Sequence, residues 1–202
     1  MSNHLSTSLH VDAATALAAS QAWLRRVVIG LNLCPFAKAV HGKGLVRWVC
    51  SDARDTQALL RDLAAEMVLL RDTPAAAIDT TLLVHPGVLN DFLDFNQFLD
   101  DADALLRELE LEGVLQVASF HPQYRFAGSQ SDDIGNATNR SPFPMLHLLR
   151  EASVERALQA FPEPEAIYEA NQRTLRQLGA SGWAALRAQC LCDAGEAGDP
   201  GS

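Results

Sequence analysis

The feature that most constrains the fold is an alternation of three short apolar runs with two helical patterns between residues 45 and 122. The runs at 45–50, 80–86 and 114–122 are rich in β-branched and other apolar residues, which is typical of buried strands. The segments between them, 55–72 and 89–112, repeat Leu, Met and Phe at helical spacing. Strands joined through helices of this length pair in parallel with right-handed crossovers. The alternation therefore predicts an α/β fold with a small, three-stranded, mainly parallel sheet (a βαβαβ core).

Additional helices are predicted at both ends of this core. Residues 12–29 carry an apolar stripe behind a capping aspartate, and further helices are expected at about 142–160, 164–178 and 181–190. A chain of 202 residues is long enough for one good core. We therefore expect one globular domain over residues 1–192, frayed at 1–10, and a flexible tail at 193–202. The Phe-rich helix at 89–112 faces either this core or a second copy of the chain in a homodimer, and the sequence does not decide between them.

Charge and hydropathy exclude several classes of partner. The net charge of -9 argues against a nucleic-acid or anionic-membrane surface, because both require a basic footprint. The sequence has no apolar run of about 18 residues that would predict a membrane span. Its first 20 residues lack the basic and apolar regions of a signal peptide. We therefore expect a cytoplasmic protein without disulfides, whose Cys190-x-Cys192 pair is structural.

The predicted strands place a thiol and two imidazoles at their carboxyl ends. Cys50 ends the first strand, His85 the second and His121 the third. Ligands bind at this edge of a parallel sheet, so these side chains are expected to lie close together there if the strands are adjacent. A metal bound by the three remains an alternative to three ordinary strand-end residues.

A long polar loop follows the third strand, "SFHPQYRFAGSQSDDIGNATNRSPFP" at 119–144. Loops of this length in a compact domain are usually functional or disordered. Ser141 followed by proline predicts a helix N-terminus, which can bind an anion together with Asn139 and Arg140. The loop also supplies candidates for catalysis and for further substrate contacts. The candidates for catalysis are His121, Tyr124 and Asp133, and those for substrate binding are Arg125, Asn136, Asn139, Arg140 and Ser141.

A second candidate segment is "GLNLCPFAKAV" at 30–40, in which Cys34 precedes a proline. If Pro35 opens a short helix, the thiol lies at its N-terminus, where the helix dipole favours a thiolate. No carboxylate lies between Asp12 and Asp52, whereas five Lys and Arg residues do. Residues 113–131 and 134–150 also lack acidic residues, and these acid-free stretches together predict an electropositive pocket. The motif "CPFA" also resembles the active-site turn of omega-type glutathione transferases, although the predicted elements around it differ.

Three hypotheses about function follow from these residues. The leading one is a small enzyme acting on a phosphorylated or carboxylated metabolite, with His121 as general acid or base and Cys34 as nucleophile or substrate contact. Tyr124 would stabilise developing charge, and Asp133 would either orient His121 or contribute to a metal site. The alternatives are a non-catalytic metabolite sensor that uses the same pocket, and a thiol-redox protein centred on Cys34. The sequence predicts neither a cofactor nor the reaction type.

Three segments together resemble an uncharacterised bacterial family, the domain of unknown function numbered 1415. They are "GLNLCPFAKAV", "SFHPQYRF" and "IGNATNRSPFPMLHLLREASVERAL", and the resemblance spans roughly residues 20–180. It implies a single-domain bacterial protein with no assigned activity, substrate or cofactor. The family therefore supplies no catalytic residues to carry over.

Overall fold

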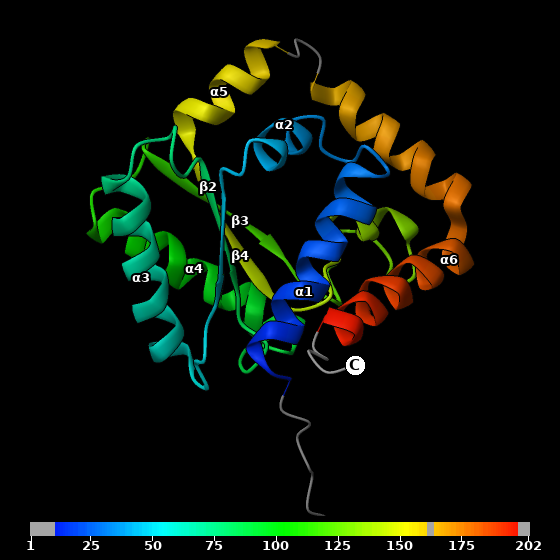
Figure 1. Ribbon diagram of the computed structural model, residues 1–202, viewed down its shortest axis with the longest axis horizontal. Coiled ribbons are helices and arrows are strands. Elements are labelled where there is room, and N and C mark those ends of the chain that lie inside the picture. Colours follow the sequence, from blue (N-terminus) through cyan, green and yellow to red (C-terminus); the bar gives the residue numbers. More distant parts are fainter. Residues whose placement is uncertain (1–10, 161–163, 198–202) are drawn as a thin grey trace, which may run out of the picture.

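A four-stranded sheet forms the centre of the protein, as a computed structural model that describes residues 11–160 and 164–197 shows (Figure 1). Its strands are β1 (Val46–Cys50), β2 (Thr80–Val84), β3 (Leu115–Phe120) and β4 (Met145–Arg150), in the spatial order β1-β2-β4-β3. β1 pairs with β2 in parallel, and β4 pairs antiparallel with both β2 and β3. Strands β1, β2 and β3 therefore run in one direction, and β4 lies between two of them in the other.

This sheet corrects the predicted one. The α/β class and the three predicted strands are confirmed, but the sheet is mixed and has four strands, because residues 145–150 form a strand instead of the start of a helix. The side chains of β4 alternate between the faces of the sheet: Leu146 and Leu148 contact one core cluster and Met145 the other. A central strand buried on both faces reads as a continuous apolar run, which local periodicity does not separate from a helix.

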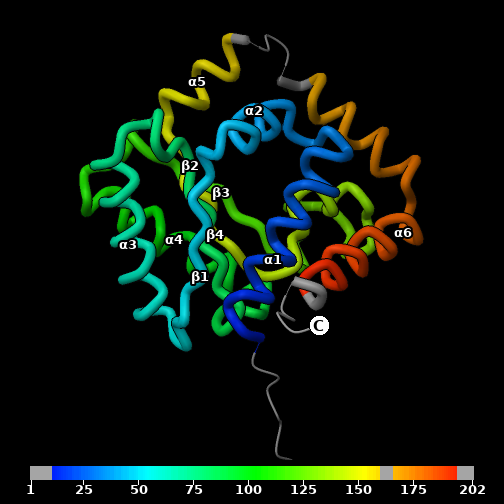
Figure 2. Tube along the Cα trace, in the orientation of Figure 1, coloured from blue at the N-terminus to red at the C-terminus, as the bar shows by residue number. Residues whose placement is uncertain are grey.

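Helices cover both faces of the sheet, as Figures 1 and 2 show. On one face lie α3 (Thr56–Asp72) and α4 (Phe92–Glu108), which bury leucines and phenylalanines against β2, β3 and β4. Phe95 and Phe98 of α4 are buried there, so this helix faces the core. Asp55 and Asp91 accept hydrogen bonds from the first backbone N–H groups of these two helices, which explains where they begin.

The other face is covered by helical segments from both ends of the chain. They are α1 (Ala13–Trp23), the π-helical turn η1 (Leu24–Ile29), α2 (Ala37–Gly42) and α6 (Pro164–Ala197). The 3-10 helix η2 (Ile134–Asn139) packs against α6 on this side. α1 lies along the second half of α6 (Figure 1), where Arg26 forms an ion pair with Asp193 at 2.8 Å.

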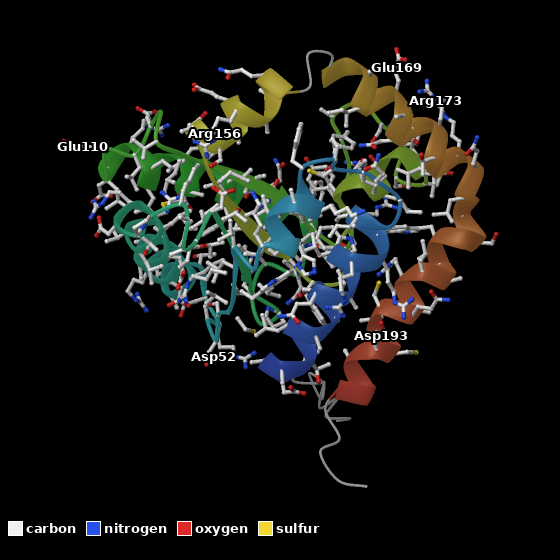
Figure 3. All side chains as sticks on the ribbon, turned by 45° about the horizontal axis from the view of Figure 1, so that its top comes forward. Asp52, Glu110, Arg156, Glu169, Arg173 and Asp193 are labelled. Atoms are coloured by element: carbon white, nitrogen blue, oxygen red, sulfur yellow. The ribbon has the colours of Figure 1, made fainter. Side chains whose placement is uncertain are left out.

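The long helix α6 bends sharply at Gly179, whose φ of 66° and ψ of 176° are not helical. Positive φ values are easily adopted only by glycine, which explains the residue at this kink. The break predicted near residues 179–182 is thus confirmed. Before the kink, Glu169 and Arg173 point away from the sheet in Figure 3, at an ion-pair distance of 3.6 Å.

The end of the chain differs from the prediction in one respect. Helix α6 continues to Ala197, so residues 193–197 of the predicted tail are helical, and Ala194 among them is buried. The remainder of that tail, 198–202, and the predicted frayed residues 1–10 lie outside the described residues. Within the described ranges, no helix is both long enough and apolar enough to cross a membrane.

Candidate functional site

A cavity of about 370 Å³ lies between the sheet and the helical segments of the α1 face. All four strands contribute to its floor, with Val46, Thr80, Leu82, Gln116, Ala118, Phe120, His147 and Leu149. Its walls come from α1, η1, α2 and α5 (Glu151–Ala160). In Figure 2, α2 and α5 border the same end of the sheet. The cavity therefore lies over the face of the sheet, from Val46 and Thr80 at the amino ends of β1 and β2 to Phe120 at the carboxyl end of β3, and its lining does not include the predicted strand-end residues Cys50, His85 and His121.

One imidazole lies among the apolar residues of the cavity floor. His147 of β4 is flanked by Phe120, at 6.0 Å between ring centroids, and Phe120 contacts the Trp23 ring edge-on at 5.1 Å. The His147 Nε2 atom is 2.7 Å from the Thr80 hydroxyl, which itself donates to the Leu148 carbonyl at 2.6 Å. Burial lowers the pKa of His147 from 6.5 to about 4. At neutral pH the cavity thus contains an uncharged imidazole.

The polar side chains at the end of the cavity near α5 form hydrogen bonds with other parts of the protein. Arg150 of β4 donates to the Leu70 carbonyl at 2.6 Å, to the Ile78 carbonyl and to the Thr73 carbonyl. Ser153 donates to Asp79 at 2.6 Å and so connects α5 to the start of β2. The cationic and anionic side chains at this end therefore have partners within the protein.

The cavity wall contains one residue that the sequence singled out, Cys34. The thiol is half-buried and lies between η1 and α2. The expected short helix begins at Ala37, whose N–H donates to the Cys34 carbonyl at 3.2 Å, so the thiol lies in the turn before the helix. The neighbouring η1 has π-helical hydrogen bonding and contributes Leu24 and Val28 to the wall. π-Helical turns occur frequently at functional sites.

The polar loop after β3 lies outside the cavity, and its side chains bind the loop's own backbone. Asn136 is 1% exposed, accepts from the Phe126 N–H and the Ser129 hydroxyl, and donates to the Gln130 carbonyl. Arg140 donates to the Tyr124 carbonyl at 3.1 Å and to the Ser131 carbonyl at 2.7 Å. The cluster of polar residues therefore has a structural explanation.

The other predicted loop residues also lie outside the cavity. Asp133 accepts from the Gly135 N–H at the start of η2, and Asn139 donates to the Ser119 carbonyl at 3.2 Å. The Tyr124 ring contacts Phe126 at 5.0 Å and Phe92 at 5.4 Å. Arg125 is exposed and does not line the cavity. Their catalytic and substrate-binding roles stay predictions.

The predicted anion site at Ser141 loses its structural premise. No helix begins after Ser141, because residues 145–150 form β4. The Ser141 hydroxyl donates instead to the Phe143 carbonyl. The basic residues of the acid-free stretches also do not form one pocket: Arg26 pairs with Asp193, and Arg47 pairs with Glu66 at 2.7 Å.

Two of the three predicted strand-end residues converge. His85 and His121 are both fully buried and both lie against the Phe95 ring, at 5.7 and 5.1 Å between ring centroids. His121 accepts from the Gln123 N–H and donates to the Leu89 carbonyl, so both its nitrogens are occupied. Burial also lowers its pKa. His121 therefore acts as a neutral brace between two loops, which does not favour the predicted acid–base role.

The three predicted strand-end residues are not arranged around one metal site. Cys50 contacts the core cluster on the α1 face, whereas His85 packs on Phe95 of α4 on the opposite face. Burial raises the pKa of the Cys50 thiol to about 11, which keeps it protonated. Among residues 11–160 and 164–197, no group of three or more His, Cys, Asp or Glu is arranged to hold a metal ion.

His147 is the residue of the cavity that sequence reasoning missed. It lies in "PMLHLLRE", which the apolar pattern assigned to a helix. In a strand with period 2, a histidine with two apolar residues on each side marks a position whose side chain does not pack entirely in an apolar core. That signal was present, but it depends on recognising the strand.

The mixed sheet with helices on both faces and a cavity against one face defines an α/β protein. Within that class, the chain belongs to a family of proteins of unknown function, DUF1415, whose sequence profile matches residues 15–185. No curated protein and no solved structure matches the chain. The family membership confirms the resemblance and assigns no activity.

Proposed function

We propose that the protein binds a small, largely apolar molecule in the cavity between the sheet and α1, η1, α2 and α5. The observation that carries this proposal is the cavity itself, with its volume of about 370 Å³ and its wall of aliphatic and aromatic side chains around one imidazole. Ligand sites are typically hollows of roughly 300–1,000 Å³ with mostly apolar walls and a few polar groups that fix orientation. Protein cores otherwise pack without such spaces.

The elements around the cavity support a binding role. The sheet floor is rigid, because β4 is paired on both sides along its length. α5, by contrast, packs mainly on β4 and contributes Val154, Ala157 and Leu158 to the wall. Leu158 is 43% exposed, so α5 forms the border between the cavity and solvent. A ligand can then enter beside α5 without any change in the sheet.

A second candidate function is enzymatic, and one specific observation favours it. Cys34 and His147 line the same cavity, so a thiol nucleophile and a neutral imidazole base would face the same ligand. This keeps the predicted role of Cys34 and replaces His121 with His147 as the proton acceptor. The predicted anionic substrate is less well supported by this cavity, since its cationic side chain, Arg150, is held by backbone carbonyls.

The test is to fill the cavity and to measure binding. Ala118 of β3 lies directly opposite His147 in the strand register and lines the cavity, so Ala118→Phe places a phenyl ring inside it. The matched control is Ala104→Phe, at an exposed position of α4 on the other side of the sheet. Binding of 1-octanol is measured by isothermal titration calorimetry, and co-purifying molecules are identified by native mass spectrometry.

We expect 1-octanol to bind the wild-type protein and the Ala104→Phe variant, and not the Ala118→Phe variant. Ala118→Leu, a smaller insertion, serves if Ala118→Phe does not fold, and is expected to weaken binding by an intermediate amount. Equal binding by all variants, or no binding by the wild type, would refute the proposal. Turnover of any co-purifying molecule that is lost in Cys34→Ser would favour the enzymatic candidate.

A further inference from the structure

The cavity contains a hydrogen-bond chain that fixes which nitrogen of His147 carries a proton. The Thr80 hydroxyl has one hydrogen and donates it to the Leu148 carbonyl at 2.6 Å. The hydroxyl oxygen can then only accept from His147, 2.7 Å away, so Nε2 must be the protonated nitrogen. The other ring nitrogen, Nδ1, consequently presents a lone pair.

The Nδ1 atom is available to a ligand. It has no hydrogen-bond partner within the described part of the chain, and it is not fully buried. His147 is only partly buried although it lies in the middle of the sheet, and the cavity that it lines accounts for this access. His147 therefore offers a ligand a hydrogen-bond acceptor in the middle of the floor, whereas the Gln116 amide, which also lines the floor, can donate or accept.

The charge around His147 excludes several kinds of ligand. Burial holds its pKa near 4, so the imidazole is neutral at physiological pH and offers no positive charge to an anion. Asp79 is occupied by Ser153, and Arg150 by backbone carbonyls, at the far end of the cavity. A carboxylate or phosphate at His147 would direct lone pairs at a lone pair, without a cation to compensate for lost water. An acceptor-only ligand such as an ether would leave Nδ1 without a partner.

We propose that the cavity selects neutral amphiphiles, molecules with an apolar body and one hydroxyl or N–H group that donates to Nδ1 of His147. This inference rests on the proposed function and adds the chemical class of the ligand. Thr80 acts as a positioning residue, because its hydroxyl holds the imidazole in the tautomer with a free Nδ1. The apolar floor around His147, with Leu82, Ala118 and Phe120, contacts the body of the ligand.

Two isomeric probes separate this inference from the proposed function. 1-Octanol and dibutyl ether contain the same atoms, but only the alcohol donates a hydrogen bond, and octanoate adds the anion as a third probe. In calorimetric titrations of the wild-type protein we expect 1-octanol to bind about tenfold more tightly than dibutyl ether. Octanoate is expected to bind more weakly than 1-octanol. In His147→Phe, which keeps an aromatic ring without the acceptor, the preference for the alcohol should disappear.

A measurement on the wild-type protein keeps the inference testable if His147→Phe does not fold. In ¹⁵N NMR of the histidine-labelled protein, we expect His147 to show the Nε2–H tautomer, with a shift of the Nδ1 resonance on addition of 1-octanol and none with dibutyl ether. Thr80→Val should reduce the preference for the alcohol and populate the other tautomer.

The outcomes distinguish the two levels of the argument. Equal affinity of the two isomers, tighter binding of octanoate, or an Nδ1–H tautomer would overturn the inference about ligand class while leaving a binding cavity in place. Absence of binding by all three probes, or binding that Ala118→Phe leaves unchanged, would overturn both.

Discussion

The fully buried His85 makes the protein sensitive to acid in a way that can be calculated. Its ring lies in the core on the α4 face, stacked on Phe95, and its Nδ1 atom is 3.1 Å from the Val88 carbonyl. The Nε2 atom is buried without a partner among the described residues. Burial, with a smaller contribution from the neighbouring His121, lowers the pKa of His85 from 6.5 to about 4.

The sign of the effect follows from where the protons bind. Between pH 6.5 and about pH 4 the unfolded chain protonates His85 whereas the folded protein does not, so stability falls as the pH falls through this interval. Above pH 6.5 the contribution is fully present. At about 1.4 kcal/mol per pH unit, the loss from His85 is about 2 kcal/mol at pH 5 and about 3 kcal/mol when complete. For a protein with a free energy of unfolding of about 5–15 kcal/mol, this is a large fraction.

The perturbation is His85→Phe, which keeps an aromatic ring of similar size against Phe95. We expect a change of at most about 1–2 kcal/mol at pH 7, because one hydrogen bond is lost and one unpartnered nitrogen is removed. Between pH 7 and pH 5 the variant should lose about 2 kcal/mol less than the wild type. The assay is urea denaturation at both pH values, followed by far-UV circular dichroism. Carboxylates and other histidines titrate in both proteins, so their effects cancel.

The control is Leu63→Val, which removes one methylene from the same core and carries no titratable group. It should cost about 1 kcal/mol at both pH values alike. The reasoning is refuted if wild type and His85→Phe lose the same stability between pH 7 and pH 5. It is also refuted if the difference has the opposite sign.

Three further predictions concern other parts of the molecule. Asn136→Ala removes three hydrogen bonds within the loop after β3, so the free energy of unfolding, measured by urea denaturation, should fall by about 2–3 kcal/mol. Proteolysis between residues 123 and 135, followed by peptide mapping, should also become faster. Glu66→Gln breaks the pair with half-exposed Arg47 and should cost about 1–2 kcal/mol in the same denaturation assay; no loss would show that solvent compensates. Bound 1-octanol should slow alkylation of Cys34 and leave that of exposed Cys192 unchanged, by mass spectrometry; equal slowing at both would place the alcohol elsewhere.

Local pattern was enough to predict most of the sheet. The strands β1, β2 and β3 and the helices α3 and α4 all lie within the predicted ranges, because each combines a strong apolar period with a clear cap or turn. β4 was not predicted, since "SPFPMLHLL" combines a helix-start signal with leucines that fit both periods. Residues 145–150 form a strand because they pair with β2 and β3, which are distant in sequence. Tertiary context overrides local preference in such a strand.

The candidate site could likewise be predicted from the sequence only in part. Cys34 could be found from the sequence because its chemistry is visible in one residue and its neighbours. His147 became recognisable only once β4 was placed beside β2, where Thr80 determines its tautomer. Most of the cavity is formed by ordinary core residues from eight elements, and no spacing along the chain distinguishes them from the residues that fill the opposite core.

The loop at 119–144 shows why a concentration of polar residues in a loop is ambiguous evidence for function. A segment that leaves a strand without regular structure must still satisfy its backbone N–H and C=O groups where they are buried. Asn136 and Arg140 do so here, because they bind backbone groups of four other loop residues. Polar residues of this kind would be selected whether or not a ligand is bound. A side chain becomes evidence for a ligand when the fold leaves a polar atom accessible and unpaired in a hollow, and in this protein His147 meets that criterion while the loop residues do not.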